Sequence, residues 1–105
     1  MTDWAADVKA HAPGADDHAI AEIVKYCGIA LRNRDSALVS FTNKDELKTV
    51  RESFLKKKLG LTNSDAELDA AIAAVGEQLK GAKTKNRVTV YYLLAEHFGK
   101  IPAFT

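Results

Sequence analysis

The most apolar run of the chain extends from Asn86 to Gly99, with the sequence NRVTVYYLLAEHFG. At helical spacing its apolar side chains cover almost the whole circumference. Such a helix is stable only when neighbouring elements bury it on nearly all sides. The pattern therefore predicts a central helix over residues 86–99. A strand over Val88–Tyr91 is rejected, although β-branched residues cluster there, because no second strand is available to pair with it.

The segments upstream carry narrower apolar stripes, which are typical of helices with one buried face. A first helix is predicted from about residue 2 to the Pro13-Gly14 pair, and a second begins at Asp16 or Asp17. The stripe of this second helix consists of Ile20, Ile23, Val24, Cys27 and Leu31. Gly28 falls inside the second helix in this interpretation, and it predicts a close approach by another helix.

Two further helices are predicted from capping signals. Asn43 with Glu46 three residues later resembles a capping box, and Gly60 ends the helix that follows. Ser64 with Glu67 is a clear capping box, and the helix after it continues to about residue 81. Between residues 33 and 42 the helical period is lost, and one helical turn is favoured there over an extended segment. The prediction is an all-α fold, a compact single domain over residues 1–105 with about five helices and the C-terminal helix central.

Composition restricts the compartment. A chain of 105 residues fits one domain. The longest apolar run is too short to span a bilayer, so no membrane partner is expected. The first residues lack the basic and then apolar pattern of a signal peptide, and the single cysteine, Cys27, has no second cysteine with which to form an internal disulfide. A cytoplasmic protein is therefore predicted.

Charge is arranged in blocks that the net charge of +1 conceals. Residues 1–22 and 61–79 each carry a net charge of −4, whereas residues 23–60 carry +5 and residues 80–105 carry +4. We expect acidic and basic helices to pack side by side and to neutralise one another locally. An outward-facing basic surface is the alternative.

One basic cluster lacks a local explanation. Lys83, Lys85 and Arg87 gather around the start of the central helix, where cations oppose the helix dipole and free N–H groups attract anions. The cluster is therefore a candidate anion-binding site for a phosphate or carboxylate. Internal pairing of these three cations is favoured over anion binding. Their partners would be the acidic N-terminal block or the acidic residues of the preceding helix, Asp65, Glu67 and Asp69.

The remaining reactive side chains do not form a catalytic group. Tyr91 and Tyr92 are favoured as core residues over base-stacking residues, and Cys27 as a small buried hydrophobe. The histidines are assigned to exposed loops (His11 and His18) and to the negative end of the central helix (His97). The sequence thus predicts no catalytic residue, no cofactor and no metal site.

Three stretches carry a resemblance to a known family: KYCGIALRNRDSALV from Lys25, RESFLKKKLGL from Arg51, and residues 86–100. With their order, they resemble a small uncharacterised alphaproteobacterial family, domain of unknown function 2853. The resemblance implies an all-helical single domain. It implies no activity, cofactor or catalytic residue.

The predicted function is that of a small non-enzymatic interaction or adaptor module with a protein partner. The alternative is binding of nucleic acid or a phosphorylated ligand at the basic cluster. Self-association into a homo-oligomer is left open, with the apolar C-terminal end at Ile101, Ala103 and Phe104 as its expected surface.

Overall fold

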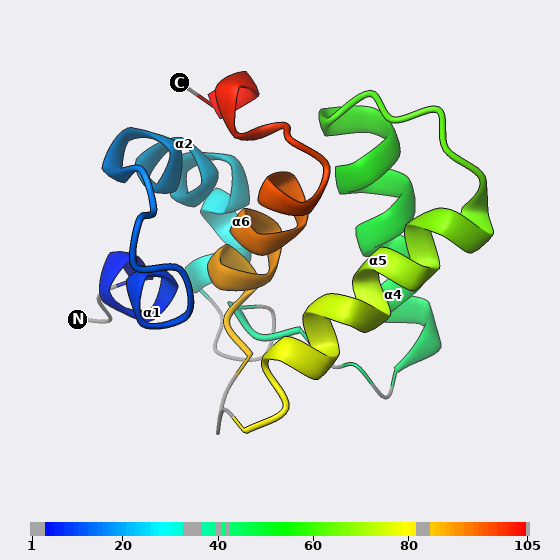
Figure 1. The fold of residues 1–105 in the computed structure, drawn as a ribbon, viewed down its shortest axis with the longest axis horizontal. Coiled ribbons are helices and arrows are strands. Elements are labelled where there is room, and N and C mark those ends of the chain that lie inside the picture. The colour runs from blue at the N-terminus through cyan, green and yellow to red at the C-terminus, as the bar shows by residue number, and fades with distance from the viewer. Residues whose placement is uncertain (1–3, 33–36, 40, 42, 82–84, 105) are drawn as a thin grey trace.

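Helix α6 (Arg87–His97) runs through the middle of the molecule (Figure 1). The structure is a computed structural model that describes residues 4–32, 37–39, 41, 43–81 and 85–104. Helices α1 (Trp4–His11) and α2 (Asp17–Cys27) lie on one side of α6 in Figure 1, and both contact it. The short 3₁₀-helix η1 (Gly28–Arg32) continues directly from α2.

The other side of α6 is occupied by α4, η2 and α5 (Figure 1). Helix α4 (Lys44–Thr49) continues without a break into η2 (Val50–Lys58), which has the wider hydrogen bonding of a π-helix, and α5 (Asp65–Gln78) follows. The final 3₁₀-helix, η3 (Ile101–Phe104), packs against α2. The described residues thus contain five α-helices, of which α6 is central and the other four surround it, and the predicted all-α fold is confirmed.

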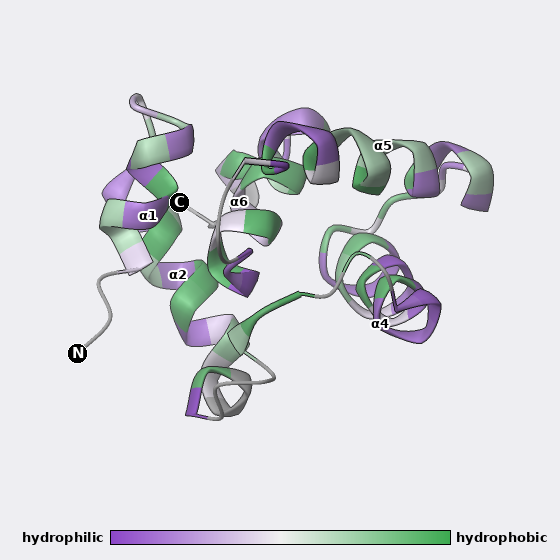
Figure 2. Cartoon of the chain, turned by 90° about the horizontal axis from the view of Figure 1, so that it is seen from below, coloured by the Kyte–Doolittle hydropathy of each residue, from purple (hydrophilic) through white to green (hydrophobic). Residues whose placement is uncertain are grey.

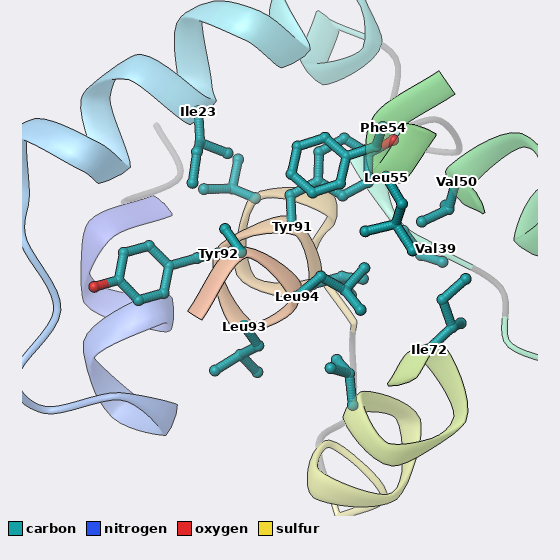
Figure 3. Packing of buried hydrophobic residues seen from close by; sticks show 14 of the residues in the cluster. Ile23, Val39, Val50, Phe54, Leu55, Ile72, Tyr91, Tyr92, Leu93 and Leu94 are labelled. Atoms are coloured by element: carbon teal, nitrogen blue, oxygen red, sulfur yellow. The ribbon is translucent and has the colours of Figure 1, made fainter. Parts of the chain in front are cut away.

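The core is built around α6, whose residues from Arg87 to Ala95 are all buried. Figure 3 shows Tyr91 facing Phe54 of η2, while Tyr92 points away from it on another side of α6. Ile23 of α2 and Ile72 of α5 approach from other directions (Figure 3). Burial on nearly every side confirms the prediction made from the apolar run, and residues 88–91 are helical as predicted.

The predicted helix starts agree with the structure where the signal is local. The Asp16 carboxylate accepts the backbone N–H groups of His18 at 2.7 Å and Ala19 at 3.1 Å, so Asp16 caps α2. At α5, the N–H of Glu67 donates to Ser64 Oγ at 3.3 Å and the N–H of Ser64 donates to Glu67 Oε1 at 3.4 Å. This reciprocal pair is the predicted capping box.

The prediction for Gly28 was wrong. Gly28 does not lie inside α2 but ends it and begins η1, with a φ of 41°, and a side chain placed there would meet no atom within 4 Å. Its N–H donates to the carbonyl of Val24. A positive φ costs a glycine little, so the residue stops the helix and does not admit a neighbouring one.

The stretch from 33 to 42 is described only at residues 37–39 and 41. Leu38 forms an isolated antiparallel bridge with Asn86, and the N–H of Val39 donates to the carbonyl of Lys85 at 2.9 Å. The favoured helical turn therefore does not extend to Leu38 and Val39, because their backbone pairs with the residues that precede α6. Residues 33–36, 40 and 42 lie outside the described residues.

Hydrophilic positions alternate with hydrophobic ones along α1, α2, α4 and α5, as the hydropathy colouring of Figure 2 shows. The acidic block on α5 meets the basic block on η2, where Lys56 Nζ lies 2.6 Å from Asp65 Oδ1. Lys9 and Asp17 form a similar contact between α1 and α2 at 2.5 Å. The predicted neutralisation between blocks thus occurs where η2 meets α5, whereas Lys9 and Asp17 pair within the acidic block of residues 1–22.

Candidate functional site

A groove of about 670 Å³ lies between α4 and α5. Its floor is apolar, formed by Phe41, Leu47, Ile72 and Ala73, and charged side chains stand along its rim. Leu47 and Phe41 are only partly buried, and α4 contains no fully buried residue. One side of α4 is therefore left uncovered by the rest of the described chain, and the groove follows that side.

One end of the groove is closed by an ion pair where η2 meets α5. Arg51 Nη1 donates to both carboxylate oxygens of Asp69, at 3.1 and 3.0 Å. Arg51 Nε also donates to Glu52 at 2.9 Å. Hydrogen bonds from Arg51 and Lys56 lower the pKa of Glu52 to about 2. These paired charges fix the position of η2 against α5 and leave Arg51 engaged inside the protein.

The other end is formed by Phe41 lying against Gly76 of α5. A Cβ atom on residue 76 would lie 2.9 Å from Phe41 Cδ1, which is closer than Cβ atoms ordinarily come to other atoms. Glycine at this position therefore allows the Phe41 ring to pack closely against α5 and to extend the apolar floor.

The two walls of the groove carry opposite charge. The wall formed by α4 and η2 presents three basic residues, Lys44, Lys48 and Arg51, and one acidic residue, Asp45. The wall formed by α5 presents two acidic residues, Asp69 and Glu77. Because Arg51 and Asp69 bind each other, the unpaired positive charge on α4 is that of Lys44 and Lys48, which form no ion pair with any described residue. An occupant would meet a basic wall and an acidic wall across an apolar floor.

Sequence reasoning did not identify this groove. Lys44 and Lys48 have the i, i+4 spacing that places them on one helix face, and α5 carries four closely spaced alanines, Ala70, Ala71, Ala73 and Ala74. Of these alanines, Ala71 is buried, Ala73 lines the groove, and Ala70 and Ala74 are exposed. The small exposed residue at position 73 is a signal that was available, but it does not show which helix lies opposite.

The predicted anion site is divided by the structure. Lys83 lies outside the described residues, and Lys85 is partly buried with its carbonyl accepting the N–H of Val39. Arg87 is buried, its Nη2 forms an ion pair with the Glu46 carboxylate, and its Nη1 donates to the Tyr91 hydroxyl at 3.0 Å. An incoming anion would have to compete with Glu46 for Arg87. Anion binding at this cluster stays a prediction.

The acid that pairs with Arg87 is not among those the sequence indicated. Asp65 and Asp69 pair with basic residues of η2, and Glu46 of α4 reaches Arg87 across 41 positions of sequence. The Asn43 side chain accepts the N–H groups of Asp45 and Glu46 at 3.0 and 3.2 Å, so the predicted cap of α4 is confirmed. A full capping box would also have the Glu46 side chain accept the N–H of Asn43. Here the Glu46 carboxylate binds Arg87 instead.

Both tyrosines of α6 are core residues, as predicted. Tyr91 and Tyr92 are 5% and 2% exposed, which leaves neither ring face open to stack on a base. The Tyr91 ring stacks on Phe54 with 4.0 Å between centroids, and burial raises the pKa of Tyr91. The Tyr92 hydroxyl accepts the backbone N–H of Asp16 at 3.0 Å, which ties α6 to the start of α2.

The histidines are dispersed over three helices. His11 ends α1, His18 lies in the first turn of α2, and His97 ends α6, where it is exposed and contacts Phe98 edge-on at 5.0 Å between ring centroids. Within the described residues, no group of three or more His, Cys, Asp or Glu side chains is arranged to hold a metal ion.

Cys27 is expected to be unreactive in the folded protein. The thiol is buried, and burial raises its pKa to about 12, although the nearby Arg87 charge partly opposes this. At pH 8 only about one thiol in ten thousand would then be ionised. We expect a disulfide reagent to modify Cys27 at least 100-fold more slowly in buffer than in concentrated urea, where the pKa returns to ~8.5.

The raised pKa of the Cys27 thiol also fixes how the stability of the fold depends on pH. Because the folded-state pKa lies above the unfolded value, the contribution of the neutral thiol to stability is complete below about pH 8.5 and is lost as the pH rises towards 12. The C27S variant serves as the unlabelled control. Equal labelling rates in buffer and urea at pH 8 would show that the thiol is exposed.

The fold and the groove define a small all-α domain with one candidate binding surface. The chain belongs to the family described as "Protein of unknown function (DUF2853)", whose model matches residues 3–102. The resemblance drawn from the three sequence stretches is thus confirmed at the level of the family. A search of curated proteins gives no match. None of the described helices has the length and apolar character needed to cross a membrane.

Proposed function

We propose that the protein is a bacterial cytoplasmic interaction module whose groove between α4 and α5 receives part of a partner protein. The observation that carries this proposal is the apolar groove of about 670 Å³ beside a helix, α4, with no fully buried residue. Burial of apolar floor residues is the main favourable contribution at protein interfaces. The charged rim would then select the partner and speed its approach.

Binding is proposed in preference to catalysis. The titratable residues that line the groove are lysine, arginine, aspartate and glutamate at its rim, whereas its floor is formed by apolar side chains. The pKa of Arg51 on this rim is raised by its hydrogen bonds to Glu52 and Asp69. A guanidinium held in its charged form does not exchange protons near neutral pH, so this rim supports recognition.

The test uses Ala73 as the point of access to the groove. A photo-cross-linking amino acid placed at position 73, in cells that naturally produce the protein, is expected to form a covalent adduct with a protein that mass spectrometry then identifies. The purified partner is next titrated against the wild-type protein and the A73R and A74R variants. Ala74 is also exposed on α5 but does not line the groove, so A74R is the matched control.

We expect A73R to weaken binding by at least about tenfold, because the arginine side chain would occupy the floor, and A74R to leave the affinity unchanged. Circular dichroism would show that both variants keep the helical content of the wild type. The proposal fails if position 73 yields no protein adduct, or if the captured protein binds A73R and wild type equally well.

A further inference from the structure

We infer that the occupant of the groove is an amphipathic helix that lies in one direction only, with an acidic flank against α4 and a basic flank against α5. The inference rests on the proposed function, and it adds the chemistry of the partner segment. It follows from the charges of the two walls, from the shape of the groove and from the absence of a pairing edge for an extended peptide among the described residues.

Shape and length favour a short helix. The groove extends along α4 and η2 from Lys44 to Arg51 and along α5 from Asp69 to Glu77. At 1.5 Å per residue, each wall is roughly 11–12 Å long, which corresponds to about two turns of a third helix. Apolar side chains of the partner at positions i, i+3 or i+4, and i+7 would then face Leu47 and Ile72 on the floor.

An extended peptide fits less well. Such a peptide needs backbone partners for its own N–H and C=O groups, which are usually supplied by the edge of a sheet. The only β-type pairing among the described residues is the isolated bridge between Leu38 and Asn86, neither of which lines the groove. A helix satisfies its own backbone groups and needs only the apolar floor.

The charges select the direction of that helix. Lys44 and Lys48 both point from one wall and form no ion pair with any described residue, while Glu77 stands on the opposite wall. Asp45 lies between the two lysines in sequence and reduces the positive charge of their wall without cancelling it. Turning an amphipathic helix end for end, with its apolar face kept down, exchanges its two flanks. A helix with an acidic and a basic flank is therefore accepted in one direction and opposed in the other.

The probes are two stapled, fluorescein-labelled helical peptides of about 12 residues, or ~18 Å of helix. Both carry the same leucine face and the same composition. The first peptide has two glutamates at i, i+4 on one flank and two lysines on the other. When this peptide lies antiparallel to α5, its glutamate flank meets α4. The second peptide has the two flanks exchanged. A third peptide, with glutamine at all four positions, binds through the leucine face alone.

At low salt we expect the two charged peptides to bind with similar affinity, about fivefold to tenfold more tightly than the glutamine peptide, and in opposite directions, because each places its glutamates against α4. A spin label at the same end of each peptide should therefore broaden amide signals near Lys44 for one peptide and near Arg51 for the other. The preference should shrink in 0.5 M salt, because exposed charges are then screened over ~4 Å.

The double variant K44E/K48E should abolish or reverse the charge preference and leave the affinity for the glutamine peptide within about twofold. K25E/K57E makes the same change of charge at exposed lysines that do not line the groove, and it should behave as the wild type. Binding of both charged peptides to the wild type in the same direction, an unchanged direction on K44E/K48E, or broadening at both ends of the groove would overturn the helix inference. A cross-link at position 73 would still leave the proposed function standing, so the two failures are distinguishable.

Discussion

Replacement of Phe54 by alanine is expected to lower the free energy of unfolding by about 3–5 kcal/mol. Phe54 is fully buried, and its ring stacks on Tyr91 with 4.0 Å between centroids and 14° between planes. Tyr26 packs against the same ring at 5.8 Å. Truncation would remove the apolar surface and leave a cavity between η2 and α6, which the rigid neighbouring helices are poorly placed to fill.

This loss is large because domains of this size are held by only about 5–15 kcal/mol. Urea unfolding followed by circular dichroism would measure it, with F54L as the variant that keeps most of the volume and K57A as an exposed control on η2. We expect K57A to change the free energy of unfolding by less than ~0.5 kcal/mol. A loss below about 1 kcal/mol for F54A would contradict the packing described between η2 and α6.

Features set by neighbouring residues were predictable from the sequence. Ser64 and Glu67 are three residues apart, and their reciprocal hydrogen bonds need no partner from elsewhere in the chain. The burial of α6 was likewise predictable, because its apolar side chains surround the helix and no solvent-facing side is left.

Features set by long-range contacts were not predictable. A glycine in the sequence can lie inside a helix or end it, and for Gly28 only the positive φ of the folded chain distinguishes the two cases. The Glu46 carboxylate was equally suited to its own helix start and to Arg87, and the tertiary fold brings Arg87 within reach. The groove has the same origin, since its walls come from helices that no local pattern places opposite each other.

The Arg87–Glu46 pair is expected to show a strong energetic coupling. Arg87 is 7% exposed, so E46A would leave a buried guanidinium with the Tyr91 hydroxyl as one remaining polar contact. Loss of one partner of a fully buried pair costs ~3–5 kcal/mol. We expect a somewhat smaller loss of about 2–3 kcal/mol, because a quarter of the Glu46 side chain is exposed and the site already admits some water.

The reverse change should cost less, and the double variant shows why. In R87M the Glu46 carboxylate can turn towards solvent, so we expect a loss of about 1–2 kcal/mol. In the double variant E46A/R87M no charge is left buried and the methionine fills part of the space of the arginine. Its loss should therefore fall about 1–2 kcal/mol below the sum of the single losses.

A double-mutant cycle measured by urea unfolding tests this coupling, with K48A as the exposed control on the same helix. Single losses that add to within ~0.5 kcal/mol would show that the two side chains do not stabilise the fold through each other.

Coupling of the expected size also affects anion binding at the basic cluster. An anion that binds Arg87 must first separate it from Glu46, so E46A should favour anion binding at the start of α6 even as it destabilises the fold.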